Sequence, residues 1–73
     1  MLKEIEIKSK EQVEQINRLA CQAPYEVWLF TKDMMLDARS LLGLYALIGK
    51  RVNVVTEDSV DPRSLDRLVD KMS

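Results

Sequence analysis

Apolar and polar side chains alternate near the start of the chain, where Ile5 and Ile7 are separated and flanked by charged residues. This two-residue period predicts a strand with one buried face. Strand-forming residues are again concentrated between Tyr25 and Lys32, with apolar side chains on both faces, which favours a central strand. The predicted strands are residues 2–8, 25–32, 34–37 (after a turn at Lys32 and Asp33) and 51–55.

Helical spacing separates the first two strands and returns at the end of the chain. Ser9 followed by Gln12 is a capping box, and Pro24 ends the first helix. Its predicted buried stripe consists of Val13, Ile16, Leu19, Ala20 and Ala23. Asp61 and Pro62 are a cap and a first-turn proline that begin the last helix. That helix is predicted to bury Leu65, Leu68, Val69 and Met72.

The region between Ser40 and Gly49 is nearly continuous apolar sequence. Ser40 is suited to cap a helix by accepting first-turn amide protons, and Gly49 is a natural terminator. On this helix, Leu44, Leu47 and Ile48 share the face expected on the sheet, Leu42 and Ala46 lie on another, and Leu41 and Tyr45 fall between. Because a short helix buries only one stripe, the surplus apolar surface predicts a docking site.

The order of elements is β-α-β-β-α-β-α, which predicts an α+β two-layer open-faced sandwich. In this fold class, three helices cover one face of a four-stranded antiparallel sheet, and residues 1–73 form one domain. The pattern leaves the order of the strands open, and a ferredoxin-like order is the main alternative.

The amino-acid composition argues against several classes of function. The 73 residues carry 11 basic and 12 acidic side chains without a basic stripe, and the few aromatic residues offer no stacking platform, so nucleic acid is not an expected partner. No apolar run is long enough to span a bilayer and no signal-peptide core is present. The single cysteine fits a reducing cytosol, and a cytoplasmic location is expected.

Histidine is absent, which removes His-ligated metal sites, His-based triads and phosphohistidine chemistry. Glu4, Glu6, Glu11 and Glu14 are interspersed with lysines and are interpreted as a solvated face with salt bridges. Neither a metal nor a cofactor is therefore expected. Met34 and Met35 are interpreted as filling the edge of the hairpin.

The middle of the chain resembles a known family. A hairpin ending in Asp-Ala, a basic residue, Ser and Leu-Leu-Gly-Leu, here residues 37–44, is similar to the regulatory-serine segment of HPr, the phosphocarrier protein of the bacterial sugar phosphotransferase system. The similarity continues through residues 51–55 and the helix from Pro62 to Met72, and covers roughly the last two thirds of the chain. It implies the strand order first, fourth, second, third.

In HPr the phosphoryl-accepting histidine begins the first helix, in a loop that ends His-x-Arg-Pro. Here the loop is shortened, and Ser9 stands at the position of that histidine, with Glu11 and Gln12 where Arg and Pro are expected. A carboxylate at this position repels phosphate, so the carrier reaction is predicted to be lost. The alternative is a phosphocarrier with an unusual acceptor, either Ser9 or Cys21. We interpret Cys21 as a small filler beside the buried stripe of the first helix.

The resemblance also bears on the second helix. Ser40 resembles the serine that a dedicated kinase phosphorylates in some HPr proteins, and a phosphate there would have Arg39 nearby; the other interpretation of Ser40 is a plain helix cap. The possible protein-docking residues are Leu41, Leu42, Tyr45 and Arg39, and the first three correspond to a surface on which HPr meets enzymes and regulators. The alternative, to which we give nearly equal weight, is that Leu41, Leu42 and Tyr45 are buried against a neighbouring loop, the third helix or a second copy of the chain.

These observations predict a non-enzymatic, HPr-like regulatory or protein-binding module of the phosphotransferase system family. Its expected partners are phosphotransferase-system enzymes or a transcriptional regulator, with no membrane insertion, and a homodimer is left open. Besides the unusual phosphocarrier, a self-associating α+β domain that binds a small ligand is the remaining alternative.

Overall fold

The structure is a computed structural model that describes residues 2–73. Its elements follow the predicted β-α-β-β-α-β-α order. In chain order they are β1 (Leu2–Glu6), α1 (Lys10–Gln22), β2 (Val27–Phe30), β3 (Met35–Asp37), α2 (Leu41–Tyr45), β4 (Arg51–Thr56) and α3 (Pro62–Met72).

The four strands form one antiparallel sheet in the order β1-β4-β2-β3. Leu29 of β2 lies opposite Val54 of β4 on one side and Leu36 of β3 on the other, so β2 is central as its two-sided apolar pattern predicted. On the other side of β4, Ile5 of β1 lies opposite Val52. The strand order expected from the HPr resemblance is confirmed, and the ferredoxin-like alternative is excluded.

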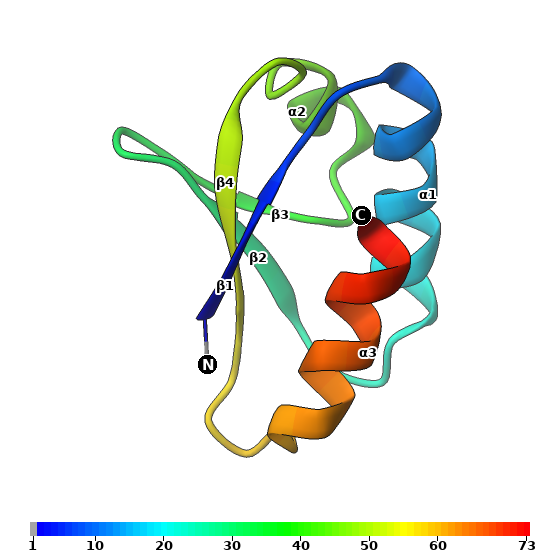
Figure 1. Cartoon of the computed structure of the whole chain (residues 1–73), viewed down its shortest axis with the longest axis vertical. Coiled ribbons are helices and arrows are strands. Elements are labelled where there is room, and N and C mark those ends of the chain that lie inside the picture. The colour runs from blue at the N-terminus through cyan, green and yellow to red at the C-terminus, as the bar shows by residue number, and fades with distance from the viewer. Residues whose placement is uncertain (1) are drawn as a thin grey trace.

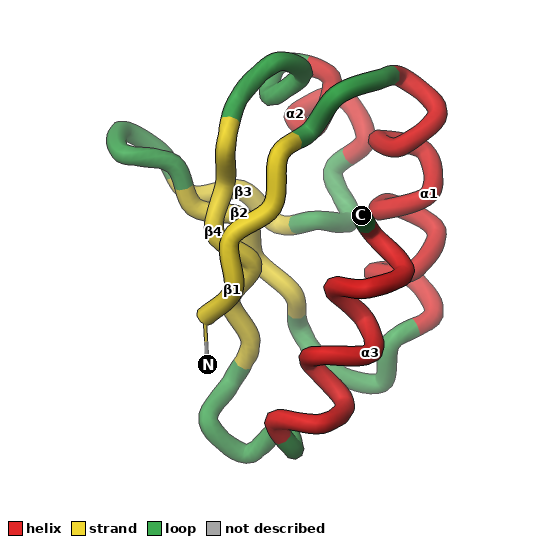
Figure 2. Tube along the Cα trace, viewed as in Figure 1, coloured by secondary structure: helices red, strands yellow, loops and turns green. Residues whose placement is uncertain are grey.

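All three helices lie on the same face of the sheet, and the opposite face is uncovered (Figures 1 and 2). α1 and α3 lie side by side along the sheet, and α2 sits at the end where α1 begins (Figure 1). This is the predicted open-faced two-layer arrangement. It places the start of α1 and the whole of α2 at the same end of the protein.

The core between the two layers is almost entirely apolar. The buried stripes predicted for α1 and α3 are confirmed, except that Leu19 and Ala23 of α1 are only partly buried. Full burial of a large apolar side chain contributes about 1.5–3 kcal/mol to the stability of the fold. Thr56 is a buried polar residue whose hydroxyl has no hydrogen-bond partner within residues 2–73. The fully buried side chains of the core include Ile7, Val13, Ile16, Val27, Leu29, Leu44, Leu47, Val52, Val54, Leu65 and Met72.

The predicted start of α1 after Ser9 and its predicted end before Pro24 are confirmed. Ser9 Oγ accepts a hydrogen bond from the Gln12 amide at 3.2 Å, and the helix ends at Gln22, before Pro24. The reciprocal half of the capping box differs from the prediction, because Gln12 Oε1 accepts from the amide of Lys8, at 2.8 Å, and not from that of Ser9.

The helix predicted from Ser40 to Gly49 is shorter than expected. α2 ends at Tyr45, and the amides of Ala46 and Leu47 donate to carbonyls three residues earlier, those of Gly43 and Leu44. This tighter spacing winds the chain by about 120° per residue instead of 100°. Gly49 does adopt the left-handed conformation expected of it, with φ of 90°, but it closes a turn that follows the helix.

Candidate functional site

The exposed surface of α2 is the first candidate site. Leu42 is 85% exposed, and Leu41 and Ile48 are 37% and 39% exposed; we call these three residues the α2 patch. Leu44 and Leu47 are fully buried. The sequence therefore predicted the buried face correctly for Leu44 and Leu47 and wrongly for Ile48. The tighter winding after Tyr45 turns the Ile48 side chain towards solvent.

Close packing beneath α2 fixes which side faces outward. A Cβ atom on Gly43 would lie 3.0 and 3.2 Å from the two terminal methyl groups of Leu36 in β3. The lack of a side chain at Gly43 therefore lets the helix approach the strand closely. Because Gly43 and Leu44 face the sheet, the side chain of Leu42 points into solvent.

Tyr45 is only partly exposed and joins α2 to α1. Its hydroxyl donates a hydrogen bond to Glu14 Oε2 at 3.1 Å. Partial burial and this carboxylate raise the pKa of Tyr45 above its ordinary value. Tyr45 therefore borders the α2 patch, where its ring packs against the core.

Ser40 occupies the N-cap position of α2, but its side chain makes no capping hydrogen bond. The predicted cap interaction is thus wrong, and the backbone carbonyl of Ser40 makes the first helical bond instead, to the amide of Leu44 at 3.1 Å. Ser40, Leu41 and Leu42 are all exposed, and the exposed start of a helix can bond to water in place of a side-chain cap. The Ser40 hydroxyl is consequently open to solvent.

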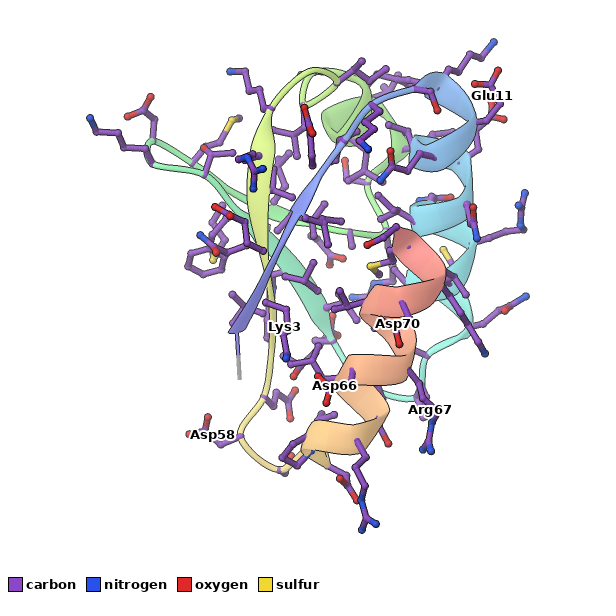
Figure 3. The ribbon with its side chains drawn as sticks, in the orientation of Figure 1. Lys3, Glu11, Asp58, Asp66, Arg67 and Asp70 are labelled. Atoms are coloured by element: carbon purple, nitrogen blue, oxygen red, sulfur yellow. The ribbon has the colours of Figure 1, made fainter. Side chains whose placement is uncertain are left out.

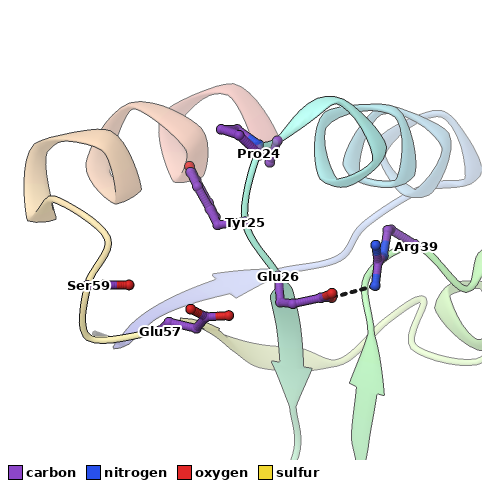
Figure 4. A pocket seen from close by; sticks show the side chains of 7 residues that line it. Pro24, Tyr25, Glu26, Arg39, Glu57 and Ser59 are labelled. Atoms are coloured by element: carbon purple, nitrogen blue, oxygen red, sulfur yellow. Dashed lines mark hydrogen bonds and ion pairs between the residues drawn. The ribbon is translucent and has the colours of Figure 1, made fainter.

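Arg39 is held by two carboxylates. Its guanidinium pairs with Glu26 at the base of β2 and with Asp37 at the end of β3, the latter at 3.0 Å (Figure 4). The side-chain hydrogen bond from Arg39 lowers the pKa of Asp37, and these bonds raise the pKa of Arg39 itself. The positive charge predicted to assist a phosphate on Ser40 is therefore already compensated.

Arg39 and Glu26 also line a cleft of about 400 Å³, together with Tyr25, Glu57 and Ser59 (Figure 4). Two of these side chains are carboxylates and one is a guanidinium. The cleft thus has no excess positive charge with which to hold a phosphate or another anion.

Ser9 lies at the start of α1, where the resemblance placed the HPr histidine. Its Oγ is engaged with the amide of Gln12 at 3.2 Å, and its carbonyl accepts from Val13 at 3.1 Å. Glu11, in the first turn of the helix, is exposed and adds negative charge to this end. The observed role of Ser9 is that of a helix cap.

Cys21 is exposed on α1, so it does not act as the small filler beside the buried stripe that the sequence predicted. Its position beside the buried stripe turns its thiol to the solvent side of the helix. Cys21 lies twelve positions after Ser9 in the chain, which corresponds to a helical rise of about 18 Å. The two alternative phosphoryl acceptors therefore do not share a site.

Charged groups elsewhere in the described residues are spread out. No group of three or more potential metal ligands forms within residues 2–73, and Glu4 pairs with Arg51 at 2.8 Å. Met34 and Met35, expected to fill the hairpin edge, are 42% and 59% exposed. No helix of the described chain is long and apolar enough to cross a membrane.

Some contacts that shape this end of the protein carried no recognisable sequence signal. Asn17 Nδ2 donates to the carbonyl of Arg39 at 3.0 Å and so holds the segment before Ser40 against α1. Gln12 Nε2 donates to the carbonyls of Glu6 and Met72. Polar residues on a helix surface reveal such long-range partners only in three dimensions.

Comparisons with known proteins agree with this architecture. No protein-family model and no curated protein sequence matches the chain. Among solved structures, HPr-C-His from Thermoanaerobacter tengcongensis is similar, with a TM-score of 0.76 and 21% identity over 99% of this chain and 90% of that one. The phosphocarrier protein HPr from Bacillus anthracis str. Ames has a TM-score of 0.75 and 16% identity over 100% and 96% of the two chains. The protein therefore has the fold of the HPr phosphocarrier proteins.

Proposed function

We propose that this chain is a non-enzymatic, cytoplasmic HPr-like module that binds a protein partner through the α2 patch. The observation that carries the proposal is the exposure of Leu42, at 85%, next to the partly exposed Leu41 and Ile48. Large apolar side chains exposed on a short helix and the turn that follows it are unfavourable in water. A partner that covers them recovers the free energy of removing that surface from solvent.

The rigidity of the surroundings supports the same proposal. α2 is fixed from below by the buried Leu44 and from the side by the hydrogen bond between Tyr45 and Glu14. The patch is therefore presented in one orientation, and little conformational entropy is lost on docking. Expected partners are an enzyme of the phosphotransferase system or a transcriptional regulator.

The absence of phosphoryl transfer is the second part of the proposal. The 73 residues contain no histidine, and Ser9 is engaged as a helix cap beside the exposed carboxylate of Glu11. The nearby carboxylate opposes the approach of a phosphoryl group by charge repulsion. The module is proposed to bind partners without passing a phosphoryl group to them.

A regulatory role for Ser40 remains part of the proposal, supported by its open hydroxyl and its place directly before Leu41 and Leu42. A phosphate there would add negative charge at the rim of an apolar docking surface. Because Arg39 is occupied by Glu26 and Asp37, the added charge would stay uncompensated. Phosphorylation of Ser40 is therefore expected to weaken apolar docking.

Replacing Leu42 tests the docking function. Leu42→Glu places a charge on the α2 patch but alters no buried contact, so the free energy of unfolding should change by less than about 0.5 kcal/mol. Capture of the partner from an extract of the source cells should be abolished. Met35→Glu is the matched control, since Met35 is an exposed apolar residue outside the patch, and it should capture the partner normally.

Loss of the fold in Leu42→Glu would mean that Leu42 is a core residue, and equal capture by both variants would exclude the α2 patch. The identity of the captured protein is then read by mass spectrometry. Binding of that purified protein to the native chain, measured by calorimetry, completes the test.

Phosphoryl acceptance is tested separately. With the phosphodonor enzyme of the phosphotransferase system, no radiolabel should enter the chain; label on Ser9 or Cys21 would instead favour the unusual phosphocarrier. With an HPr kinase and ATP, a mass gain confined to Ser40 is expected, and it should be absent in Ser40→Ala. No mass gain in the native chain would end the regulatory role of Ser40.

A further inference from the structure

A second groove lies between the C-terminal half of α1 and the middle of α3. It has a volume of about 280 Å³, its floor includes Leu19, Pro24 and Leu68, and Arg67 and Lys71 lie on its α3 side. None of these residues belongs to the α2 patch. The groove combines an apolar floor with two basic side chains.

The walls of the groove are tied together by hydrogen bonds. Gln15 Nε2 on α1 donates to the carbonyl of Lys71 at 2.6 Å, and Gln12 Nε2 donates to the carbonyl of Met72 at 3.0 Å. In the floor, Leu68 is 8% exposed and packs into the core. The groove is thus preformed, which is typical of binding sites.

The two basic side chains are not used within the protein. Arg67 and Lys71 are exposed, and neither forms an ion pair with any residue between 2 and 73. They are four residues apart on one helix face, where like charges repel each other. An anionic ligand between them would relieve that repulsion.

The acidic residues of α3 lie away from the groove. Asp66 points towards Lys3 of β1 and pairs with it at 3.0 Å, whereas Arg67 leaves the helix on the side of the chain that follows α1 (Figure 3). Asp70 lies one turn beyond Asp66 and forms no ion pair with Arg67 in the described chain. Charge is therefore segregated across α3, with the positive side on the groove.

The opposite wall adds no negative charge. On α1 the residues that face α3 include Gln12, Gln15 and Leu19, and Arg18 lies next to Leu19 in sequence. Glu26 and Glu57 line the separate cleft that Tyr25 also borders, and neither lines this groove. Glu26 is already paired with Arg39.

We propose that this groove binds an acidic peptide segment of a protein partner. An apolar side chain of the segment would lie on Leu19 and Leu68, and flanking carboxylates would pair with Arg67 and Lys71. A guanidinium suits this task because it can bind a carboxylate with two parallel hydrogen bonds. The proposal does not depend on the α2 patch, so the two can fail separately.

The test uses a short fluorescein-labelled peptide in which a leucine is flanked by glutamates. Binding to the native chain is followed by fluorescence anisotropy, and the site is mapped by amide chemical shifts. Shifts are expected at Leu19, Ser64 and Leu68, binding should weaken with added salt, and a peptide with glutamines in place of the glutamates should not bind.

Arg67→Glu should raise the Kd of the peptide by about tenfold or more. Arg63→Glu is the matched control: it makes the same charge change on the same helix, at a side chain that is 84% exposed and outside the groove, so the Kd should stay within about twofold. Arg67→Gln, which leaves the helix neutral at that position, is the second variant and should raise the Kd by a smaller factor.

Other results would overturn the proposal. These are equal weakening by Arg67→Glu and Arg63→Glu, shifts confined to residues 41–48, or no binding of the peptide. Inorganic phosphate that produces the same shifts and displaces the peptide would show a simple anion site. A dimer in sedimentation that Arg67→Glu dissociates would show that a second copy of the chain covers the groove.

Discussion

Gln12 shows how much a single side chain contributes to this fold. Its Oε1 accepts from the amide of Lys8, and its Nε2 donates to the carbonyls of Glu6 and Met72, all within 3.0 Å. One residue thereby joins the end of β1, the start of α1 and the end of α3. It stands at the position where the HPr resemblance expects a proline, which could donate and accept none of these bonds.

Replacing Gln12 should therefore destabilise the protein. Gln12→Ala is expected to lower the free energy of unfolding by about 1–2 kcal/mol, since three hydrogen bonds are lost and water replaces only the exposed ones. Gln15→Ala, which loses the single bond to Lys71, should cost about 0.5–1 kcal/mol. Urea unfolding measures both, and equal losses would contradict the joining role of Gln12.

The sequence predicted interactions with the neighbouring backbone better than it predicted which side chains are exposed. The Ser9 cap and the left-handed Gly49 could be foreseen because each depends on neighbouring backbone alone. The exposure of Cys21 and the unused hydroxyl of Ser40 could not. The first depends on where α3 and the sheet lie, and the second on water access to the first turn of α2.

At the scale of elements, α2 differs most from its sequence pattern. Its apolar run predicted a helix of two turns or more. Gly43, in the middle of this run, lowers the helix propensity. The carbonyls of Gly43 and Leu44 accept hydrogen bonds from amides three residues later instead of four. Long-range contacts hold it instead: Leu44 and Leu47 in the core and Tyr45 against Glu14. The stability of a short helix held by such contacts depends on the charges of the side chains that make them.

Alkaline pH should loosen the contact between α1 and α2. Because the pKa of Tyr45 in the folded chain lies above its unfolded value of about 10, the neutral phenol stabilises the fold below about pH 10. That contribution is lost as the pH rises through the folded-state pKa, where a tyrosinate would face the carboxylate of Glu14. The difference in free energy of unfolding between the native chain and Tyr45→Phe should therefore shrink above about pH 10.

The measurement is urea unfolding of both proteins across this pH range. Glu14→Gln provides the control, since it removes the carboxylate that helps to raise the pKa of Tyr45, and the loss should then be smaller and be complete at a lower pH. A difference between the native chain and Tyr45→Phe that is constant with pH would contradict the prediction.

For the whole molecule, apolar patterns together with caps and turns predicted the type and sequence of the seven elements, because these signals are local. The order of the strands required the HPr resemblance, since the pairing of β1 with β4 joins residues about fifty positions apart in the chain and leaves no local signal. The groove between α1 and α3 was missed for the same reason. Leu19, Arg67 and Lys71 are unremarkable in sequence and acquire a common role only when the helices lie together.

The insertion of β4 between β1 and β2 also governs how the chain can fold during synthesis. Until residues 51–56 have left the ribosome, β1 lacks its only strand partner and β2 is paired on one side alone. The nascent chain must therefore keep its apolar strands away from other chains while most of its length is translated. Assembly of the sheet is then completed in a late step, when a single strand closes both gaps at once.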